Sequence, residues 1–201
     1  MSNKLFVATN NRDKLREIRE KLDGCGVALV GMNDVEPYPE PEETGETLAE
    51  NALIKAREGF VRTGLPSLAD DSGLEVEALG GAPGVYSSRY AGENVTYEDN
   101  YRKLLAELGD LPIDRRSATF RCVMALVNDN KEVCWEGSTR GFITFEPKGE
   151  NGFGYDPVFY SEELKQTFAE ASINAKNQIS HRGRALQHLA IEVKQILSIT
   201  E

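Results

Sequence analysis

The chain has 201 residues, a length that fits one domain, or one domain with two lobes, and that can bury a substantial core. Hydrophobic residues make up 40% and charged residues 28% of the sequence, which excludes a disordered chain. The formal net charge of -10 argues against a general binder of nucleic acid, because such an acidic surface repels phosphate backbones. A small phosphate-bearing ligand is compatible with this charge, since local lysines, arginines and a metal ion can reverse the field inside one cleft.

The cysteines and the N-terminal residues indicate in which cellular compartment the protein is expected. Cys25, Cys122 and Cys134 are scattered and form no CxxC pair, a pattern typical of reduced thiols rather than of a disulfide framework. The apolar run at residues 5–8 is too short for a signal sequence and far too short to cross a membrane. We therefore expect a cytoplasmic protein that does not bind a membrane.

The first third of the chain alternates strands with helices. Residues 4–8 have the pattern of an apolar strand, and after a polar turn a helix is predicted from the apolar stripe Leu15, Ile18 and Leu22. A second short strand is predicted at residues 27–30. The acidic, proline-rich segment 36–43 is expected to be extended. A capping box at residues 47–50 begins a helix that runs to about Thr63. Its predicted buried face comprises Ala49, Ala52, Leu53, Ala56 and Phe60.

The rest of the chain adds longer strands and two helices. Residues 68–73 are predicted to be a short strand that ends in a turn, and residues 80–84 to be a loop. A helix is predicted at residues 96–108. The closing elements are two long antiparallel strands at residues 117–127 and 133–145, joined at residues 128–130, and a helix from Ser180 to about Ile199. This mixture predicts an α/β or α+β fold around a mixed sheet, in one domain with a cleft.

The first polar motif lies at the junction of the first strand and the first helix. It contains Thr9, Asn10, Asn11 and Lys14. Backbone N–H groups at a helix N-terminus favour anions, and Lys14 adds a mobile positive charge. Threonine and asparagine side chains can donate to phosphate oxygens, or they can simply cap the helix. The motif alone leaves both interpretations open.

Acidic residues in two separate segments could bind one metal ion. Asp70 and Asp71 are adjacent, so their carboxylates repel each other unless a cation or hydrogen-bond donors compensate. Hard oxygen ligands of this kind suit Mg²⁺, which usually takes one or two carboxylates plus substrate phosphate. The alternative for this pair is an ordinary Asx turn. Glu43, in the acidic loop, could reach the same ion or could be solvated.

Asn51 and Lys55 lie four residues apart on the helix that follows the acidic loop, so they share one of its faces. That face is opposite the predicted apolar stripe. Both side chains could therefore point toward a ligand or into solvent.

The segment Gly152–Pro157 places two glycines around aromatic residues, so its backbone can bend closely around a flat ligand. Phe153 or Tyr155 could stack on a base, an interaction that contributes on the order of 1–3 kcal/mol. A tight turn with aromatic packing is the alternative.

Hydrogen-bond donors gather before and at the start of the last helix, in the form of Lys176, His181 and Arg182. His181 and His188 are seven residues apart with no third ligand, which argues against a zinc site. The phosphate-binding motif GxxxxGK[ST] is absent, as are GxGxxG after the first strand and GxSxG.

In their order and spacing, these motifs resemble the inosine triphosphate pyrophosphatase family, whose members remove non-standard purine nucleoside triphosphates. The matching stretches cover the chain from end to end: Thr9-x-Asn11-x-x-Lys14, Glu43-Thr-Gly45, Glu50-Asn-Ala52 with Lys55-Ala56, Ala69-Asp-Asp-Ser-Gly73, Gly80-Gly-Ala-Pro-Gly84 with Ser88-Arg-Tyr90, Phe153-Gly-Tyr-Asp-Pro157 and Ser180-His-Arg-Gly183. One position departs: Asn10 stands where the family usually has glycine. Asparagine tolerates left-handed backbone better than most residues, so we expect the loop to survive.

The resemblance implies a fold, an assembly and residue roles. The fold would be an α/β (mixed α+β) single domain, residues 1–201, with a central mixed twisted sheet, flanking helices and two lobes with the active cleft between them, usually as a homodimer. The implied roles are triphosphate binding by Thr9, Asn10, Asn11, Lys14 and Lys55, Mg²⁺ binding by Glu43 and Asp71, general-base catalysis by Asp71 with Asp70 in support, and further substrate contacts by Ser72, Phe153, Gly154, Tyr155, Asp156, Lys176, His181 and Arg182. Among these, Phe153 would stack on the base, and His181 and Arg182 would contact the purine edge.

The implied reaction is Mg²⁺-dependent hydrolysis of ITP, dITP or XTP to the monophosphate and pyrophosphate, with water attacking the α-phosphorus. Donors from His181 and Arg182 would pair with the 6-oxo group of inosine or xanthosine. They would meet a donor in adenine, a mismatch that costs about 1–3 kcal/mol per group. Two alternatives are a pyrophosphatase with another base preference, such as modified pyrimidines or dUTP, and a nucleotide-binding regulatory module without turnover.

Overall fold

The computed structural model describes residues 3–197, the side chain of Lys194 excepted, and its chain forms two compact units. Unit 1 comprises the described parts of Met1–Asp71, Cys122–Gly137 and Arg182–Glu201, and unit 2 comprises Ser72–Arg121 and Ser138–His181. The chain passes from one unit to the other inside strands β3, β5 and β6 and again at the start of helix α5. That residues 1–201 form a single domain stays a prediction.

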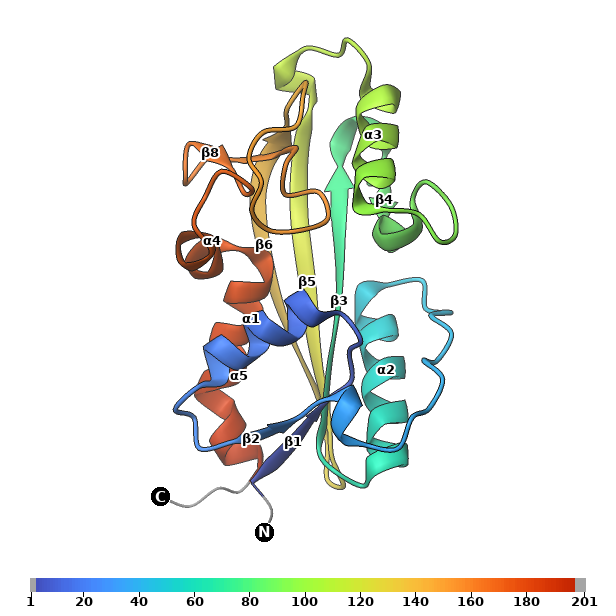
Figure 1. Cartoon of the computed structure of the whole chain (residues 1–201), viewed down its shortest axis with the longest axis vertical. Helices are drawn as coiled ribbons and strands as arrows, with labels where there is room; N and C mark the ends of the chain where they lie inside the picture. The colour runs from blue at the N-terminus through green and yellow to red at the C-terminus, as the bar shows by residue number, and fades with distance from the viewer. Residues whose placement is uncertain (1–2, 198–201) are drawn as a thin grey trace. The chain divides into compact units, whose positions relative to one another are not determined.

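The strands form one mixed sheet in the order β2-β1-β3-β5-β6-β7-β8, with β4 paired to β3 (Figure 1). Their bounds are β1 Lys4–Val7, β2 Ala28–Val30, β3 Ser67–Val76, β4 Pro83–Gly84, β5 Ser117–Val127, β6 Glu132–Ile143, β7 Phe159–Ser161 and β8 Gln166–Thr167. Strand β1 is parallel to both β2 and β3. Strand β4 is antiparallel to β3, and β7 is antiparallel to both β6 and β8. The predicted α/β fold with a central mixed sheet is confirmed.

The α-helices of the described chain are α1 Arg12–Leu22, α2 Leu48–Thr63, α3 Tyr97–Leu108, α4 Ile173–Ile179 and α5 His181–Ile196. Side chains at the N-cap fix where α1, α2, α3 and α4 begin. They belong to Asn11, Thr47, Thr96 and Ser172, and the two threonines form capping boxes with Glu50 and Asp99. The predicted starts of α2 and α3 agree with the structure because these capping motifs are local in the sequence.

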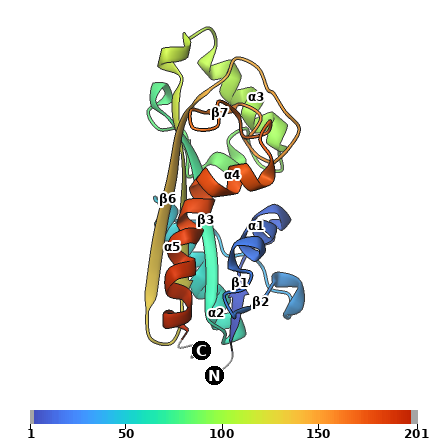
Figure 2. The same ribbon diagram turned by 90° about the vertical axis from the view of Figure 1, so that its left-hand side faces the viewer.

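In unit 1, successive residues of a strand face different helices. Leu5 and Val7 of β1 and Leu68 of β3 belong to a core that includes apolar residues of α1 and α5. Phe6 faces α2, where Gly59 lies so close that an added Cβ would meet the Phe6 ring at 2.9 Å. Since neighbouring side chains on a strand point to opposite faces, α1 and α5 cover one face of these strands and α2 covers the other. The three helices can be followed in Figure 2.

Unit 2 has a core of its own, rich in aromatic rings. Its buried members are Leu74, Val76, Leu104, Leu108, Ala118, Phe120, Ile143, Tyr155, Val158, Phe159 and Phe168. The Phe120 ring lies 4.6 Å from that of Phe159 and 5.9 Å from that of Phe168, between centroids. Burial of each such ring contributes about 2–3 kcal/mol. Because Tyr155 and Val158 belong to this core, it anchors the loop that carries the predicted base-stacking segment.

The strand that carries Asp70 and Asp71 differs from its prediction. The pair does not end a short strand in a turn, because β3 continues through it to Val76. The C-terminal part of β3 is stabilised by burial and pairing: Leu74 and Val76 are fully buried, and β4 pairs with β3 there. The Asx-turn alternative is therefore wrong for this pair. Residues 80–84, predicted to be a loop, contain strand β4.

The buried face of α2 is shifted from the predicted one. Its buried residues are Leu48, Asn51, Ala52, Ala56 and Gly59. Ala49, Leu53 and Phe60, predicted to be buried, are only partly so. Asn51, predicted to lie on the opposite face, is fully buried instead. The reason is that the helix lies very close to the sheet, and residues without a large side chain permit that approach.

The predicted last helix corresponds to α5 in the structure, and a further short helix, α4, precedes it. The extended backbone of Ser180 separates α4, which was not predicted, from α5. The predicted end at Ile199 lies outside the described residues. No helix within residues 3–197 is both long and apolar enough to cross a membrane.

Candidate active site

The loop between β1 and α1 is organised by its own side chains. Asn11 Oδ1 accepts hydrogen bonds from the backbone N–H groups of Asp13 at 2.9 Å and Lys14 at 3.2 Å. Thr9 Oγ1 accepts one from the Asn11 N–H at 3.2 Å. The helix-cap interpretation of Asn11 is confirmed, and the phosphate-binding role of this loop stays a prediction.

Asn10 stands where the family usually has glycine, which suggested a left-handed backbone at this position. The structure does not have one there. Among non-glycine residues 3–197, positive φ angles occur at Asn94 and Lys165. The Asn10 side chain instead donates from Nδ2 to Glu40 Oε1 at 2.8 Å. Asparagine therefore occupies this position without the strain that a positive φ would impose.

Asp70 is the centre of a buried charge network in unit 1. Its Oδ2 lies 3.1 Å from Lys14 Nζ and 3.1 Å from Arg182 Nη2. Arg182 is 2% exposed and also donates through Nη1 to Glu17 Oε2 at 2.7 Å. Burial alone would raise the pKa of Asp70, but Lys14 and Arg182 outweigh it and hold that pKa well below its usual range. Asp70 is thus an anion that ties α1 and α5 to strand β3.

Glu43 and Asp71 meet at one ammonium group. Lys55 Nζ donates to Glu43 Oε1 at 2.8 Å and to Asp71 Oδ1 at 2.9 Å. The two carboxylate oxygens therefore lie no farther apart than the sum of these distances. Asp71 Oδ2 is buried and has no hydrogen-bond partner. The structure brings together the acidic residues of two segments that are far apart in the sequence.

The protonation of this group follows from burial and charge. Burial raises the pKa of Asp71 above its ordinary value, although the nearby Lys55 and Lys14 act against the shift. Burial alone would lower the pKa of Lys55, but the carboxylates, led by Asp71, raise it. Lys55 is therefore a fixed cation, whereas Asp71 is a carboxylate whose affinity for a proton is increased.

In unit 2, Asp156 fixes the predicted base-stacking segment. Its Oδ2 accepts hydrogen bonds from the Phe153 N–H at 2.8 Å and from Lys176 Nζ at 2.6 Å. Lys176, only 4% exposed, also places its Nζ 4.8 Å from the centroid of the Phe153 ring. Gly152 has a φ of +75°, and an added Cβ there would collide with the Asp156 carboxylate. The segment is therefore a rigid turn that presents the partly exposed Phe153 ring.

Tyr155 is the other aromatic residue of this segment, and it is buried. Its hydroxyl donates to the Ser87 carbonyl at 2.9 Å, and its side chain belongs to the unit 2 core. Of the two rings considered from the sequence, Phe153 is the one with exposed area. The Phe153 ring has Tyr97 of α3 as a neighbour, at 5.9 Å between centroids.

The remaining predicted residues occupy different surroundings. His181 is stacked on Phe120 with 4.5 Å between centroids and is 5% exposed. Ser72 is a partly exposed residue of β3, the first residue of unit 2 after Asp71. Gly154 has a φ of +64° and open space where a Cβ would be. His188 is exposed, as expected for a surface residue.

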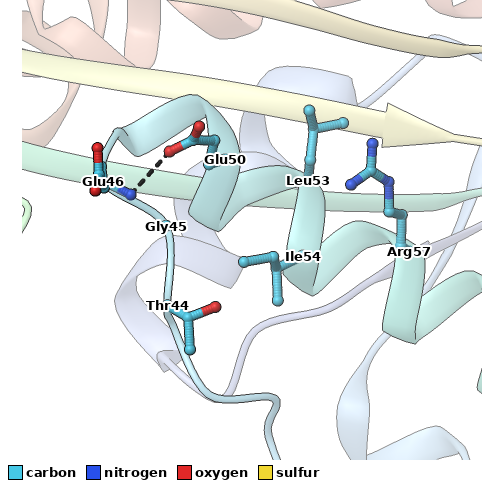
Figure 3. Close-up of a pocket in the computed structure, with 7 residues that line it drawn as sticks. All are labelled: Thr44, Gly45, Glu46, Glu50, Leu53, Ile54 and Arg57. Atoms are coloured by element: carbon cyan, nitrogen blue, oxygen red, sulfur yellow. Dashed lines mark hydrogen bonds between the residues drawn. The ribbon is translucent and has the colours of Figure 1, made fainter.

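A surface hollow of about 350 Å³ lies beside the segment that carries Glu43 (Figure 3). It is lined by Thr44, Gly45, Glu46, Glu50, Leu53, Ile54 and Arg57. Arg57 forms two hydrogen bonds with Glu132, at 2.7 and 2.6 Å. The hollow contains neither Lys55 nor either carboxylate that Lys55 contacts. Its lining comes from residues 44–46 of the segment and from α2.

Two residues that were not predicted complete these groups. Glu17 binds Arg182, and Phe120 stacks on His181. Asn51, which was considered from the sequence, binds the backbone near Glu43. Glu17 follows Lys14 by three residues, so its place on the same helix face could have been inferred. No local signal identifies Phe120, because its contact joins segments that are distant in the sequence.

Comparison with solved structures places the fold in a defined group. A HAM1 protein from Coxiella burnetii matches with a TM-score of 0.87 and 44% identity, covering 97% of this chain and 100% of that one. The structure described as a nucleoside-triphosphatase, dITP/XTP pyrophosphatase, from Mycobacterium abscessus matches with a TM-score of 0.76 and 47% identity, covering 92% and 98%.

Sequence comparison gives the same result. The profile of the Ham1 family matches residues 5–192. The dITP/XTP pyrophosphatase of Geobacter sulfurreducens is 51% identical over 184 residues, which are 91% of this chain and 92% of that protein. The protein of the same name from Mycobacterium tuberculosis is 50% identical over 186 residues, 91% of each chain. The chain belongs to the Ham1 family, which confirms the resemblance found from its motifs.

Proposed function

We propose that the protein is a nucleoside triphosphate pyrophosphatase that hydrolyses dITP, XTP and ITP to the monophosphate and pyrophosphate, thereby clearing them from the nucleotide pool. The names of its relatives support dITP and XTP, and the family resemblance of its motifs supports ITP. The observation that carries the proposal is that Lys55 joins Glu43 and Asp71. Two carboxylates and a lysine at one point are the groups needed to bind a metal–triphosphate complex.

The acidic pair fits Mg²⁺. Among residues 3–197 there is no cluster of three or more His, Cys, Asp and Glu side chains that could hold a metal. Mg²⁺ does not require one, because it usually takes one or two carboxylates and completes its shell with water and substrate phosphate. The buried, unpartnered Asp71 Oδ2 is an oxygen suited to such an ion. When bound between Glu43 and Asp71, Mg²⁺ would neutralise phosphate charge and stabilise the leaving pyrophosphate.

The lysines have the charge that the triphosphate requires. Lys55 offsets one of the two negative charges of Glu43 and Asp71. In the complex its ammonium would bind phosphate oxygens together with Lys14. Thr9, Asn10 and Asn11 would hold the phosphates at the start of α1, where the helix dipole favours anions. Asp70 would keep Lys14 in place through their ion pair.

Asp71 would also act as the general base. Its pKa is raised by burial, which brings the group closer to the range in which a base accepts a proton efficiently. It would take the proton of the water that attacks the α-phosphorus. The bond between the α-phosphorus and the bridging oxygen then breaks, and pyrophosphate leaves with that oxygen.

Residues of unit 2 would bind the nucleoside. The base would stack on Phe153, with Gly154, Tyr155, Asp156 and Lys176 holding the segment or contacting the nucleotide. Ser72 would contact the substrate as well.

Base selection would depend on hydrogen-bond donors. His181 would contact the purine edge together with Arg182, whose guanidinium is held by Glu17 and Asp70. Donors pair with a 6-oxo group but not with a 6-amino group, so adenine would be discriminated against.

The test is pyrophosphate release from a panel of triphosphates, with Mg²⁺ and again with excess EDTA. Rapid release from dITP, XTP and ITP, slow release from ATP, GTP, CTP and dUTP, and loss of release in EDTA are expected. A standard nucleotide hydrolysed as fast as ITP would refute the specificity. Undiminished hydrolysis in EDTA would refute the role given to the metal.

We also propose a homodimer, for which the resemblance to the family is the support. Sedimentation equilibrium should then give about twice the chain mass of 22.3 kDa. A mass equal to that of one chain at micromolar concentration would contradict it.

A further inference from the structure

Asn51 belongs to one of the motifs found in the sequence, yet it has been given no role in binding either the metal or the substrate. It lies on α2 and is fully buried, with 0% exposure. Its Oδ1 accepts a hydrogen bond from the Gly45 N–H at 2.8 Å. This is the segment that carries Glu43, because Gly45 is only two residues further along the chain. A buried amide at this position therefore links the helix of Lys55 to the segment of Glu43.

Gly45 lies so close to α2 that there is no room for a side chain at this position. An added Cβ at Gly45 would lie 2.6 Å from Asn51 Oδ1 and 2.6 Å from Glu50 Cβ. Both distances are far below a van der Waals contact, so the segment could not keep its place with a larger residue there. Glycine is required here for close approach to the helix rather than for an unusual backbone angle.

The segment and α2 together line the surface hollow (Figure 3). Side chains of α2 bind three successive backbone N–H groups of the segment. Asn51 binds that of Gly45, and Glu50 Oε2 binds those of Glu46 at 2.8 Å and Thr47 at 3.0 Å. The position of the segment is thus set by the first turn of the helix.

The start of α3 also has an asparagine that follows the N-cap threonine by four residues and binds the preceding loop. Comparison with it shows how Asn51 differs. There Asn100, which follows the capping box of Thr96, accepts from the Ala91 N–H at 2.8 Å and donates to the Ser88 carbonyl at 3.0 Å. Both ends of its amide are satisfied by backbone. Asn51, in contrast, has a buried Nδ2 without a hydrogen-bond partner. Such groups are rare in folded proteins, because a buried donor without a partner reduces stability, so fold stability alone does not account for an amide here.

We propose that Asn51 is a positioning residue that holds the segment 43–45 so that Glu43 and Asp71 bind one divalent ion. The proposal rests on the metal role given above to these two carboxylates. Groups that orient a metal ligand through hydrogen bonds strongly affect metal affinity even though they do not touch the ion. The Gly45–Asn51 hydrogen bond orients Glu43 from its backbone, while Lys55 contacts its carboxylate.

Three variants and one control test this role. Asn51→Ala removes the acceptor, Gly45→Ala displaces the segment from the other side of the same contact, and the double variant combines them. Asn100→Ala is the matched control, since it removes the equivalent helix-to-loop amide in unit 2. Deuterium exchange at the Gly45 amide, the dissociation constant of Mn²⁺ alone by electron paramagnetic resonance, and the Mg²⁺ concentration for half-maximal hydrolysis are measured for each protein.

In Asn51→Ala and Gly45→Ala we expect faster exchange at Gly45 and a rise of about tenfold in both metal constants, with a much smaller change of kcat at saturating Mg²⁺. Because both substitutions break one contact, the double variant should resemble the weaker-binding single variant. Asn100→Ala should leave Gly45 exchange and both metal constants unchanged.

Two results overturn the inference while the proposed function stands. One is unchanged exchange at Gly45 in Asn51→Ala. The other is faster exchange without weaker metal binding, in a wild type that requires Mg²⁺. A wild type that binds no Mn²⁺ and hydrolyses triphosphates equally well in EDTA would instead refute the metal role on which the inference rests.

Discussion

Asp70 and Asp71 share a peptide bond, yet their surroundings are opposite. As neighbours on a strand they point to opposite faces of β3, so Asp70 meets α1 and α5 while Asp71 meets α2. The pKa of Asp70 is lowered by its cations, and the pKa of Asp71 is raised by burial. Two carboxylates that are adjacent in sequence can therefore have separate roles, one structural and one chemical.

The chemical role of Asp71 can be tested by Asp71→Asn. This change keeps the size of the side chain but removes the base and one charge from the metal pair, so we expect kcat to fall by about 10²-fold or more. Asp129→Asn, an exposed position in the same unit, is the control and should be fully active. Pyrophosphate release from dITP measures both. Full activity of Asp71→Asn would show that the wrong residue was chosen as the base.

A second prediction concerns Phe153. Loss of base stacking in Phe153→Ala should raise KM for XTP about tenfold, the equivalent of the stacking energy expected for one base. Phe153→Tyr should retain most of the affinity. Phe145→Ala removes another ring of unit 2, one that is 58% exposed, and serves as the control. Equal KM values for Phe153→Ala and the wild type would exclude the stacking role.

The candidate residues were predictable individually, but most of their contacts were not. The carboxylates, lysines and Phe153 were recognisable because their residue types and order match a family. The sequence could not show that Lys55 lies between Glu43 and Asp71, since that contact joins residues 12 and 16 positions apart. It also could not show that Tyr155 is buried against Ser87, a contact over 68 positions.

Among the elements, the turn at Gly152–Asp156 offers a matched comparison between two glycines. Both have positive φ angles, but an added Cβ collides with Asp156 at Gly152 and meets nothing within 4 Å at Gly154. Gly154→Ala should therefore cost only the backbone term, about 1 kcal/mol of unfolding free energy. Gly152→Ala must also displace the carboxylate that binds Lys176 and Phe153, so it should cost clearly more and raise KM.

Urea denaturation and KM for XTP measure both glycine variants. Equal losses of stability and equal KM values would mean that the Asp156 carboxylate is not what fixes this turn.

Elements were predicted well where their determinants are local. The capping boxes at Thr47 and Thr96 fix the starts of α2 and α3, and the loop at residues 128–130 joins two correctly placed long strands. Strand β3 was cut short in the prediction because Asp70-Asp71-Ser72-Gly73 has the composition of a turn. Buried partners on both faces, which come from distant segments, override that local preference.

At the scale of the whole chain, the net charge of -10 predicts that nucleic acid is not a partner, but it says nothing about the interior. Lysines and arginines next to the carboxylates of unit 1 make that interior locally positive enough to fix Asp70 as an anion. Composition averages over such groups, so it cannot reveal them. The division into two units follows from contacts over long sequence separations, and for the same reason no local pattern indicated where its boundaries fall.

The opposite pKa shifts of the two aspartates predict opposite effects on global stability. Asp70 has a lowered pKa in the folded state, so it stabilises the protein above its unfolded-state value of about 4, and this contribution is lost as pH falls through the folded-state pKa. Asp71 has a raised pKa, so the folded state favours its protonated form, and its charge opposes folding once pH exceeds the folded-state pKa.

Asp70→Asn should therefore lower the unfolding free energy at pH 7 by about 3 kcal/mol, because it leaves Arg182 and Lys14 without a buried partner charge, and should flatten the loss of stability in acid. Asp71→Asn should be as stable as the wild type at pH 7, or more stable by up to about 1 kcal/mol, despite its loss of activity. Urea denaturation followed by circular dichroism between pH 3 and 8, with EDTA present, compares the three proteins. If Asp71→Asn were the less stable variant at pH 7, then Asp71 rather than Asp70 would be the structural carboxylate of β3, and the roles assigned to the pair would have to be exchanged.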